Sequence, residues 1–349
     1  MQFHQNLNNF VVVPVPLAEK PLMKFRTEIE PVDSGFKINL RDNIITVGSC
    51  FSEVIGSRLS ENKLDCLCNP FGTVFNPSSI FKLLRHSLSK QPVHRHLFTE
   101  NTDGYWNHFD FHSKFTADSR EKLESELLAI YDNVFKALRS CKVLVITLGT
   151  ANIYELRSNN QVVANCHKQP QKMFNHRLLT LKEIQRDFQQ FYDLLRMVNS
   201  KIKIVLTVSP VRHTRDGLKT NSISKSLLRT ACHSIEQENP NVSYFPSYEI
   251  MLDDLRDYRF YKSDLIHPSE MAEQYIFEHF TETHFSDELK EFMHDWQQIK
   301  NSLHHRPFRK ESPAHQTFLT KLLEKLNNYN EKVNMSTEIE EVRSQLIAA

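Results

Sequence analysis

Residues 44–51 read Ile44-Ile45-Thr46-Val47-Gly48-Ser49-Cys50-Phe51, an apolar run that ends in glycine and serine. Such a run predicts a buried strand that turns directly into a helix. Open α/β sheets bind ligands outside the carboxyl ends of their strands. Ser49 is therefore a candidate nucleophile, although a serine at this point is equally suited to cap a helix. Cys50 is a rival nucleophile, because thiols are intrinsically more nucleophilic.

Strand-like and helix-like patterns alternate along the rest of the chain. Apolar runs predict strands at residues 44–47, 143–148, 202–208 and 242–245. Amphipathic patterns predict helices at residues 53–60, 121–139 and 226–237, and another that opens on the capping box Thr180-Leu181-Lys182-Glu183. Near-continuous apolar strands between amphipathic helices indicate an α/β protein with a parallel sheet covered on both faces.

Four segments fall outside this alternation. Residues 1–20 are expected to be a leader or an edge segment, because the apolar stretch there is short and rich in proline. Residues 85–118 and 151–180 are expected to be insertions that cover the site. Residues 286–349 predict a C-terminal helical extension, frayed from about residue 334. The domain itself is expected to span residues 21–285.

Composition narrows the class of protein. The chain has 349 residues, 40% hydrophobic and 24% charged, with a net charge of +1. These values are ordinary for a soluble globular protein, and no basic surplus points to nucleic acid or an anionic membrane. The six cysteines, without a recognisable signal peptide, are expected to be reduced and cytoplasmic. Cys66-Leu67-Cys68 has no second pair at zinc spacing.

A carboxylate and an imidazole stand three residues apart in Asp264-Leu265-Ile266-His267. If Asp264 bonds one ring nitrogen of His267, it fixes the tautomer that can take a proton from serine. The alternative interpretation is that His267 only enters a helix, since Pro268 suits the first helical position. Two turns, at residues 69–72 and 149–152, are candidate suppliers of oxyanion donors. Their glycines equally suit ordinary turns.

Other constellations carry weaker signals. His94, His96, His108 and His112 have spacings that could bind a metal, but no carboxylate or cysteine framework joins them. Ser222-Ile223-Ser224-Lys225 has the S-x-x-K pattern of penicillin-binding enzymes and is expected to open a helix. Arg212 follows the 202–208 strand, where it could hold a polar substrate or lie in a solvated loop. No metal or cofactor is expected.

The ordered set of motifs resembles the GSCFA family, a branch of the SGNH/GDSL hydrolases. The resemblance is carried by Gly48-Ser49-Cys50-Phe51-Ser52-Glu53, Asn69-Pro70-Phe71-Gly72, Leu148-Gly149-Thr150-Ala151, Asn165-Cys166-His167-Lys168, Asp264-Leu265-Ile266-His267 and His305-Arg306-Pro307-Phe308. It implies a three-layer α/β/α sandwich with a mostly parallel central sheet. It also implies a triad of Ser49, Asp264 and His267.

The same resemblance implies oxyanion donors from Ser49 N–H, Gly72 and an asparagine. The chain departs from the SGNH pattern here, because Ala151 stands where an asparagine is usual. Asn152 is the first candidate, Asn165 and Asn69 are the others, and the Thr150 hydroxyl could also donate. Asn165 and His167, with Arg212, are predicted to bind substrate.

These observations predict a serine esterase that acts on an acetylated or acylated carbohydrate, or on a similar small ester. An acyltransferase using the same residues, or a non-catalytic binding protein with the same fold, are the alternatives. The expected partner is the ester substrate alone, without nucleic acid or membrane. An oligomer could form through the C-terminal apolar stripe, which comprises Phe318, Leu319, Leu322, Leu323 and Leu326.

Overall fold

A five-stranded parallel sheet forms the centre of the computed structural model, which describes residues 26–347. The strands lie in the order β10 (Val242–Phe245), β9 (Lys203–Val208), β5 (Val143–Leu148), β1 (Ile44–Gly48) and β2 (Cys66–Cys68). Gly48 pairs with Thr147, and Thr147 pairs with Thr207. The carboxyl ends of the three central strands therefore meet at one edge of the sheet.

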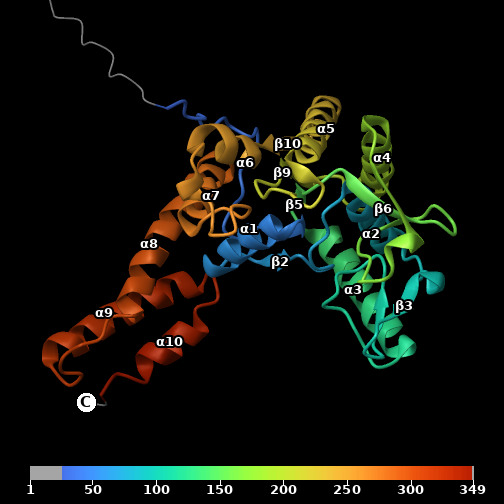
Figure 1. Ribbon diagram of the computed structural model, residues 1–349. Helices are drawn as coiled ribbons and strands as arrows, with labels where there is room; N and C mark the ends of the chain where they lie inside the picture. The colour runs from blue at the N-terminus through green and yellow to red at the C-terminus, as the bar shows by residue number, and fades with distance from the viewer. Residues whose placement is uncertain (1–25, 348–349) are drawn as a thin grey trace, which may run out of the picture.

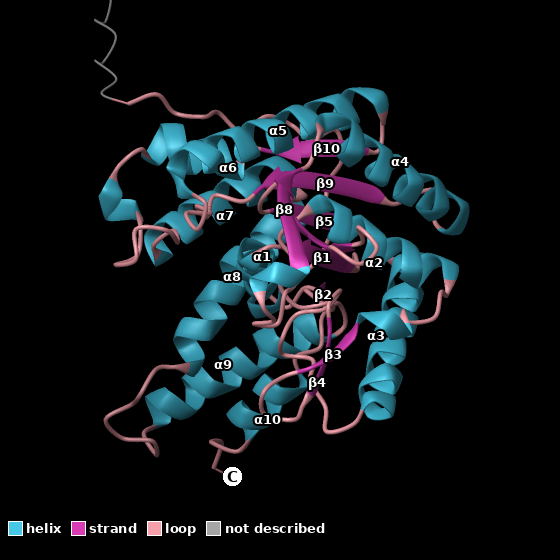
Figure 2. Ribbon diagram, turned by 45° about the vertical axis from the view of Figure 1, so that its right-hand side comes forward, coloured by secondary structure: helices cyan, strands magenta, loops and turns pink. Residues whose placement is uncertain are grey.

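Helices cover both faces of this sheet, as the sequence predicts (Figure 2). On one face Ile45 and Val47 of β1 pack in a core with helices α2 (Pro77–Ser89), α3 (Arg120–Ser140), α4 (Leu181–Val198) and α5 (Gly217–Glu238). On the other face Ile44 packs with α1 (Cys50–Glu61) and α7 (Glu270–His284). The α/β/α sandwich with a parallel central sheet is confirmed.

Three further helices follow the sandwich and project from it at the lower left of Figure 1: α8 (Asp287–Leu303), α9 (Pro313–Asn330) and α10 (Ser336–Arg343). The prediction of fraying from about residue 334 was wrong, because α10 buries Ile339 and Val342 in the same core as α9. The apolar stripe of α9 lies in that core as well, with Leu319 and Leu326 buried. The oligomer prediction thereby loses the observation on which it rested.

Two small antiparallel sheets occupy the predicted insertions. The first contains β3 (Phe98–Glu100) and β4 (Trp106–His108), and the second has the order β7 (Val162–Val163), β6 (Asn152–Leu156), β8 (Phe174–Leu178). The sequence analysis missed these strands, because short strands with polar residues lack a clear period. The remaining elements are short: 3₁₀ turns Arg95–Leu97, Gln171–Met173 and Tyr258–Phe260, α6 (Ser247–Glu249) and the π-helical Ile250–Leu255.

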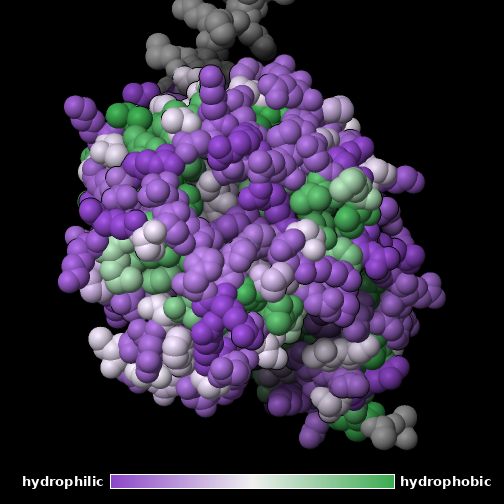
Figure 3. All heavy atoms as spheres, turned by 90° about the vertical axis from the view of Figure 1, so that its right-hand side faces the viewer, coloured by the Kyte–Doolittle hydropathy of each residue, from purple (hydrophilic) through white to green (hydrophobic). Residues whose placement is uncertain are grey.

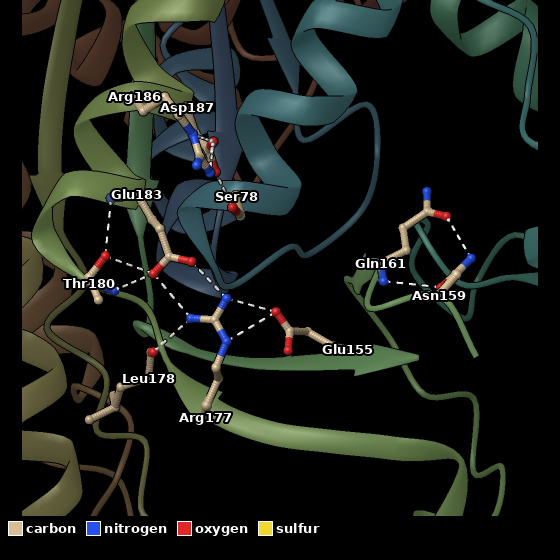
Figure 4. A network of polar contacts seen from close by, with 10 residues as sticks. All are labelled: Ser78, Glu155, Asn159, Gln161, Arg177, Leu178, Thr180, Glu183, Arg186 and Asp187. Atoms are coloured by element: carbon tan, nitrogen blue, oxygen red, sulfur yellow. Dashed lines mark hydrogen bonds and ion pairs between the residues drawn. The ribbon is translucent and has the colours of Figure 1, made fainter. Parts of the chain in front are cut away.

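A charged network fastens the second small sheet to α4 (Figure 4). Arg177 on β8 donates to Glu155 on β6 and to Glu183 on α4, with the closest contact of each pair at 2.7 Å. Thr180 and Glu183 form the predicted capping box. The hydrogen bond from Arg177 is the main reason that the pKa of Glu183 falls to about 2.

The face of the molecule that Figure 3 shows is largely hydrophilic, with only small separate hydrophobic patches.

Candidate active site

Ser49 lies at the carboxyl end of β1 and is the N-cap residue of α1. Its side chain makes no capping hydrogen bond, so the capping interpretation does not account for the hydroxyl. The residue is 1% exposed, and its Oγ is buried without a hydrogen-bond partner. Leaving a buried polar group unpaired costs about 1–3 kcal/mol. A hydroxyl kept at this cost, at the ligand-binding edge of a sheet, is a candidate functional group.

Asp264 and His267 form a hydrogen-bonded pair in the loop before α7. Asp264 Oδ2 lies 2.7 Å from His267 Nδ1, and Asp264 Oδ1 accepts the N–H groups of Ile266 and His267. Leu265 adopts a left-handed conformation (φ 59°) between them. The two backbone N–H groups, followed by the ring, lower the pKa of Asp264 to about 2. The carboxylate is thus ionised over the ordinary pH range and holds the proton of His267 on Nδ1.

Ser49 and His267 are not hydrogen-bonded to each other, since Ser49 Oγ has no partner. A neighbour of each residue lines the same cavity: Cys50 follows Ser49 in the chain, and the backbone N–H of Lys262 donates to the carbonyl of His267. The His267 side chain is partly exposed, whereas Ser49 is buried. The structure therefore forms the Asp264–His267 half of the predicted triad without the Ser49–His267 contact. Catalytic hydrogen bonds often tighten only when substrate binds.

The predicted oxyanion donors already have hydrogen-bond partners within the protein. Ser49 N–H donates to the carbonyl of Thr147 at 3.0 Å, and Gly72 N–H donates to that of Asn69 at 2.8 Å. The Asn152 amide donates to the Thr150 hydroxyl at 3.2 Å. Asn69 Nδ2 reaches the Ser49 carbonyl at 3.5 Å, while its Oδ1 accepts Gly48 N–H. An oxyanion would have to replace at least one of these partners.

The three predicted substrate-binding residues lie in two different places. Asn165 Oδ1 accepts the N–H of His167, and His167 Nε2 bonds the carbonyl of His108, so both residues hold the 165–170 turn. Arg212 instead braces the loop of Asp264 and His267. Its N–H donates to the carbonyl of Ile266 at 3.2 Å, and its guanidinium lies 4.2 Å from the centre of the Tyr261 ring.

The rival nucleophile Cys50 is half-buried beside a polar cavity of about 520 Å³. Burial raises the pKa of its thiol. The reactive form of cysteine is the thiolate, and a raised pKa makes that form rarer at neutral pH. This environment favours Ser49 over Cys50 as the nucleophile.

Lys225 is a buried residue of this region whose position the sequence analysis did not predict. It lies inside α5, which begins at Gly217, so the prediction that the S-x-x-K segment opens a helix was wrong. Its amino group is buried and donates to the carbonyls of Gly149 and Ser209, at the ends of β5 and β9. Lys225, Leu228, Cys232 and Ile235 share one helical stripe, and a lysine in an otherwise apolar stripe was the available signal.

Replacement of Lys225 by methionine is expected to alter how stability depends on pH. Burial lowers the pKa of Lys225 from 10.5 to about 7. Between these values the unfolded chain binds a proton that the folded protein lacks, so folding becomes more favourable as pH rises. The stability of the wild type relative to Lys225→Met should rise by ~1 kcal/mol per pH unit from pH 8 to 10. Urea denaturation at each pH measures this, and a pH-independent difference would contradict the buried, deprotonated lysine.

Within residues 26–347, no three histidine, cysteine or acidic side chains converge in a way that could hold a metal ion. Across the described helices, none has the length and hydrophobicity required to cross a membrane.

Comparison with known protein families gives two matches that together cover most of the chain. The GSCFA family matches residues 43–280, which include Ser49 and the Asp264–His267 pair. The C-terminal domain of GSCFA domain proteins matches residues 296–348, which include α9 and α10. A comparison with curated proteins gave no match. The chain belongs to the GSCFA family.

Proposed function

We propose that this protein is a serine esterase in which Ser49 is the nucleophile and His267 the base. The observation that carries the proposal is the Asp264–His267 pair at 2.7 Å, in a loop whose Lys262 lines the same cavity as Cys50 of the helix that Ser49 begins. Because Nδ1 of His267 faces the carboxylate, its Nε2 is the nitrogen left to accept a proton. A small acyl ester of a carbohydrate or similar alcohol is the proposed substrate class.

The reaction proceeds in two acyl-transfer steps. Nε2 of His267 removes the Ser49 proton while Oγ bonds the acyl carbon, and the carbonyl oxygen becomes an oxyanion. As the oxyanion collapses, the carbon–oxygen bond to the alcohol breaks and the alcohol takes the proton from His267. Water then attacks the acyl-serine, giving its proton to His267, and Ser49 leaves with that proton. If a second alcohol replaces water, the same steps transfer the acyl group.

Substrate binding must change the local structure before this chemistry begins. The Ser49 hydroxyl is buried, and both Gly149 and Thr150 donate N–H bonds to the carbonyl of Phe75 beside it. A Cβ added to Gly149 would lie 3.2 Å from Ser49 Cβ, so this turn contacts the serine directly. Because the Ser49 hydroxyl is buried beside this turn, the structure also suits the alternative of a binding protein without catalytic activity.

A fluorophosphonate probe distinguishes these two functions in one experiment. The probe should add its mass to the tryptic peptide that contains Ser49 in the wild-type protein, and to no peptide in Ser49→Ala. Treatment with the probe should also block the hydrolysis of p-nitrophenyl acetate by the wild type. A wild-type protein that remains unlabelled and inactive would support the binding protein instead.

Replacement of Asp264 by asparagine is expected to lower kcat by about 10²-fold, with little change in KM. Asparagine cannot stabilise the imidazolium and can favour the wrong tautomer of His267, which is the physical basis of such losses. We expect less than for a buried triad, because the side chains of His267 and Asp264 are 43% and 45% exposed. Asp257→Asn is a matched control, since Asp257 also accepts a backbone N–H two residues on. Equal activity of both variants would contradict the role of Asp264.

A cytoplasmic location, and a partner list limited to the ester substrate, remain predictions. Fractionation of cells that express the full chain tests the location.

A further inference from the structure

A second cavity lies between the two insertions, and its lining includes no residue of the Asp264–His267 loop. It has a volume of about 650 Å³, within the ~300–1,000 Å³ typical of small-molecule sites. Its walls include Tyr105 and Ser113 of the first insertion and His167 and Lys168 of the second.

The walls of this cavity are held together by hydrogen bonds between the insertions. Gln169 Nε2 donates to the carbonyl of Glu100 at 2.9 Å. The N–H groups of Ala164 and Asn165 both donate to the carbonyl of Phe109, at 2.9 and 3.0 Å. Binding therefore requires little ordering of the walls, which favours affinity.

Two local backbone features, one on each wall of the cavity, fix the side chains that line it. His167 and Lys168 are consecutive non-glycine residues with positive φ, 45° and 57°. Each such residue costs on the order of 1–3 kcal/mol and is typical of ligand sites. On the opposite wall, Asn101 Oδ1 accepts the N–H groups of Asp103 and Tyr105 and so holds the hairpin that carries the exposed Tyr105 ring.

The chemical groups around the cavity suit a polyhydroxylated ring. Glu100 and Asp103 offer carboxylate acceptors, and Lys168 offers an ammonium donor. In the described part of the chain these three side-chain charges have no ion-pair partner. Tyr105 adds an aromatic face with a polar tip, which suits a ligand that is apolar on its ring faces and polar at its edge. Charged groups form the stronger hydrogen bonds with hydroxyls.

A short series of contacts connects the cavity wall to the strand end that carries Ser49. Ser113 lines it, and the preceding residue His112 packs on Gly72, where an added Cβ would lie 2.5 Å from His112 Cβ. Two residues after Gly72, Val74 N–H donates to the carbonyl of Gly48 at 2.8 Å. These two contacts link the cavity wall to Gly48, the residue before the nucleophile.

We propose that this cavity binds one sugar unit of an oligosaccharide. If Ser49 is the nucleophile, as proposed above, the bound unit adjoins the one that carries the ester. The cavity then selects the alcohol part of the substrate, and the Ser49 site acts on its acyl group.

Binding can be measured independently of catalysis. Isothermal titration calorimetry of full-length Ser49→Ala with xylotetraose, cellotetraose and chitotetraose, each up to 10 mM, should give saturable binding of at least one. In the same background, Tyr105→Ala and Lys168→Ala should each weaken that binding by about 10-fold or more. Phe308→Ala removes an exposed aromatic ring that does not line this cavity, and it should leave binding unchanged. Thermal melting confirms that each variant is folded.

Either of two results would overturn the proposal: no binding of any of the three sugars, or equal binding by Tyr105→Ala, Lys168→Ala and Phe308→Ala. Hydrolysis of p-nitrophenyl acetate by the wild type separates this outcome from failure of the esterase proposal. Sugar binding without hydrolysis would leave the cavity supported and reject the esterase. Hydrolysis without sugar binding would do the reverse.

Discussion

Replacement of Ser49 by alanine is expected to lower kcat for p-nitrophenyl acetate by at least about 10³-fold, the scale of removing a triad nucleophile. The expectation follows from the proposed roles of two groups: the unpaired Ser49 hydroxyl at the carboxyl edge of the sheet, and the hydrogen-bonded Asp264–His267 pair. Because the hydroxyl makes no hydrogen bond, its removal should leave stability almost unchanged or raise it. Initial rates and urea denaturation curves, measured on the same variant, distinguish loss of catalytic activity from loss of folded protein.

Ser52 provides a matched control for this variant. It lies one turn further along α1, is also buried, and its Oγ is also without a partner. Ser52→Ala should therefore reproduce any effect of removing a buried hydroxyl from this helix while keeping activity. Cys50→Ala should also keep activity, since burial raises the pKa of that thiol. Activity that survives in Ser49→Ala and disappears in Cys50→Ala would identify the thiol as nucleophile.

The elements that the sequence predicts correctly are those in which nearly every residue is buried. The central strands β5 and β9 are buried on both faces, so their sequences are almost continuously apolar and their lengths are readable. The sequence did not predict the edge strand β2, because it has only three residues, all half-buried, and pairs only with β1. α5 begins nine residues before its predicted start, because its first turns are mostly polar and their two apolar side chains, Leu218 and Ile223, are exposed.

The candidate site shows a similar division. The spacing of Asp264 and His267 predicts their contact, because residues three apart in a tight turn can meet. Neither the burial of Ser49 nor the occupation of the Gly72 N–H by Asn69 is readable from a motif. Both depend on how loops from distant parts of the chain pack together, which local patterns do not encode.

Replacement of Gly48 by alanine is expected to destabilise the protein by about 4 kcal/mol or more, the sum of backbone strain and overpacking. Gly48 has φ 136°, a region that side chains rarely adopt. An added Cβ would lie 2.1 Å from the carbonyl oxygen of Thr147. That oxygen belongs to the central strand β5 and accepts the N–H of Ser49, so it cannot retreat without breaking the pairing that positions the nucleophile.

Gly217→Ala separates the two causes of this loss. Gly217 also has positive φ, 81°, but a Cβ there would meet nothing within 4 Å. It should lose only the ~1–2 kcal/mol of a left-handed residue with a side chain. Urea denaturation of both variants gives the difference, and equal losses would show that contact with Thr147 is not the cause. If Gly48→Ala is still folded enough to assay, its activity should fall more than its folded fraction, because β1 can accommodate the methyl group only by moving Ser49.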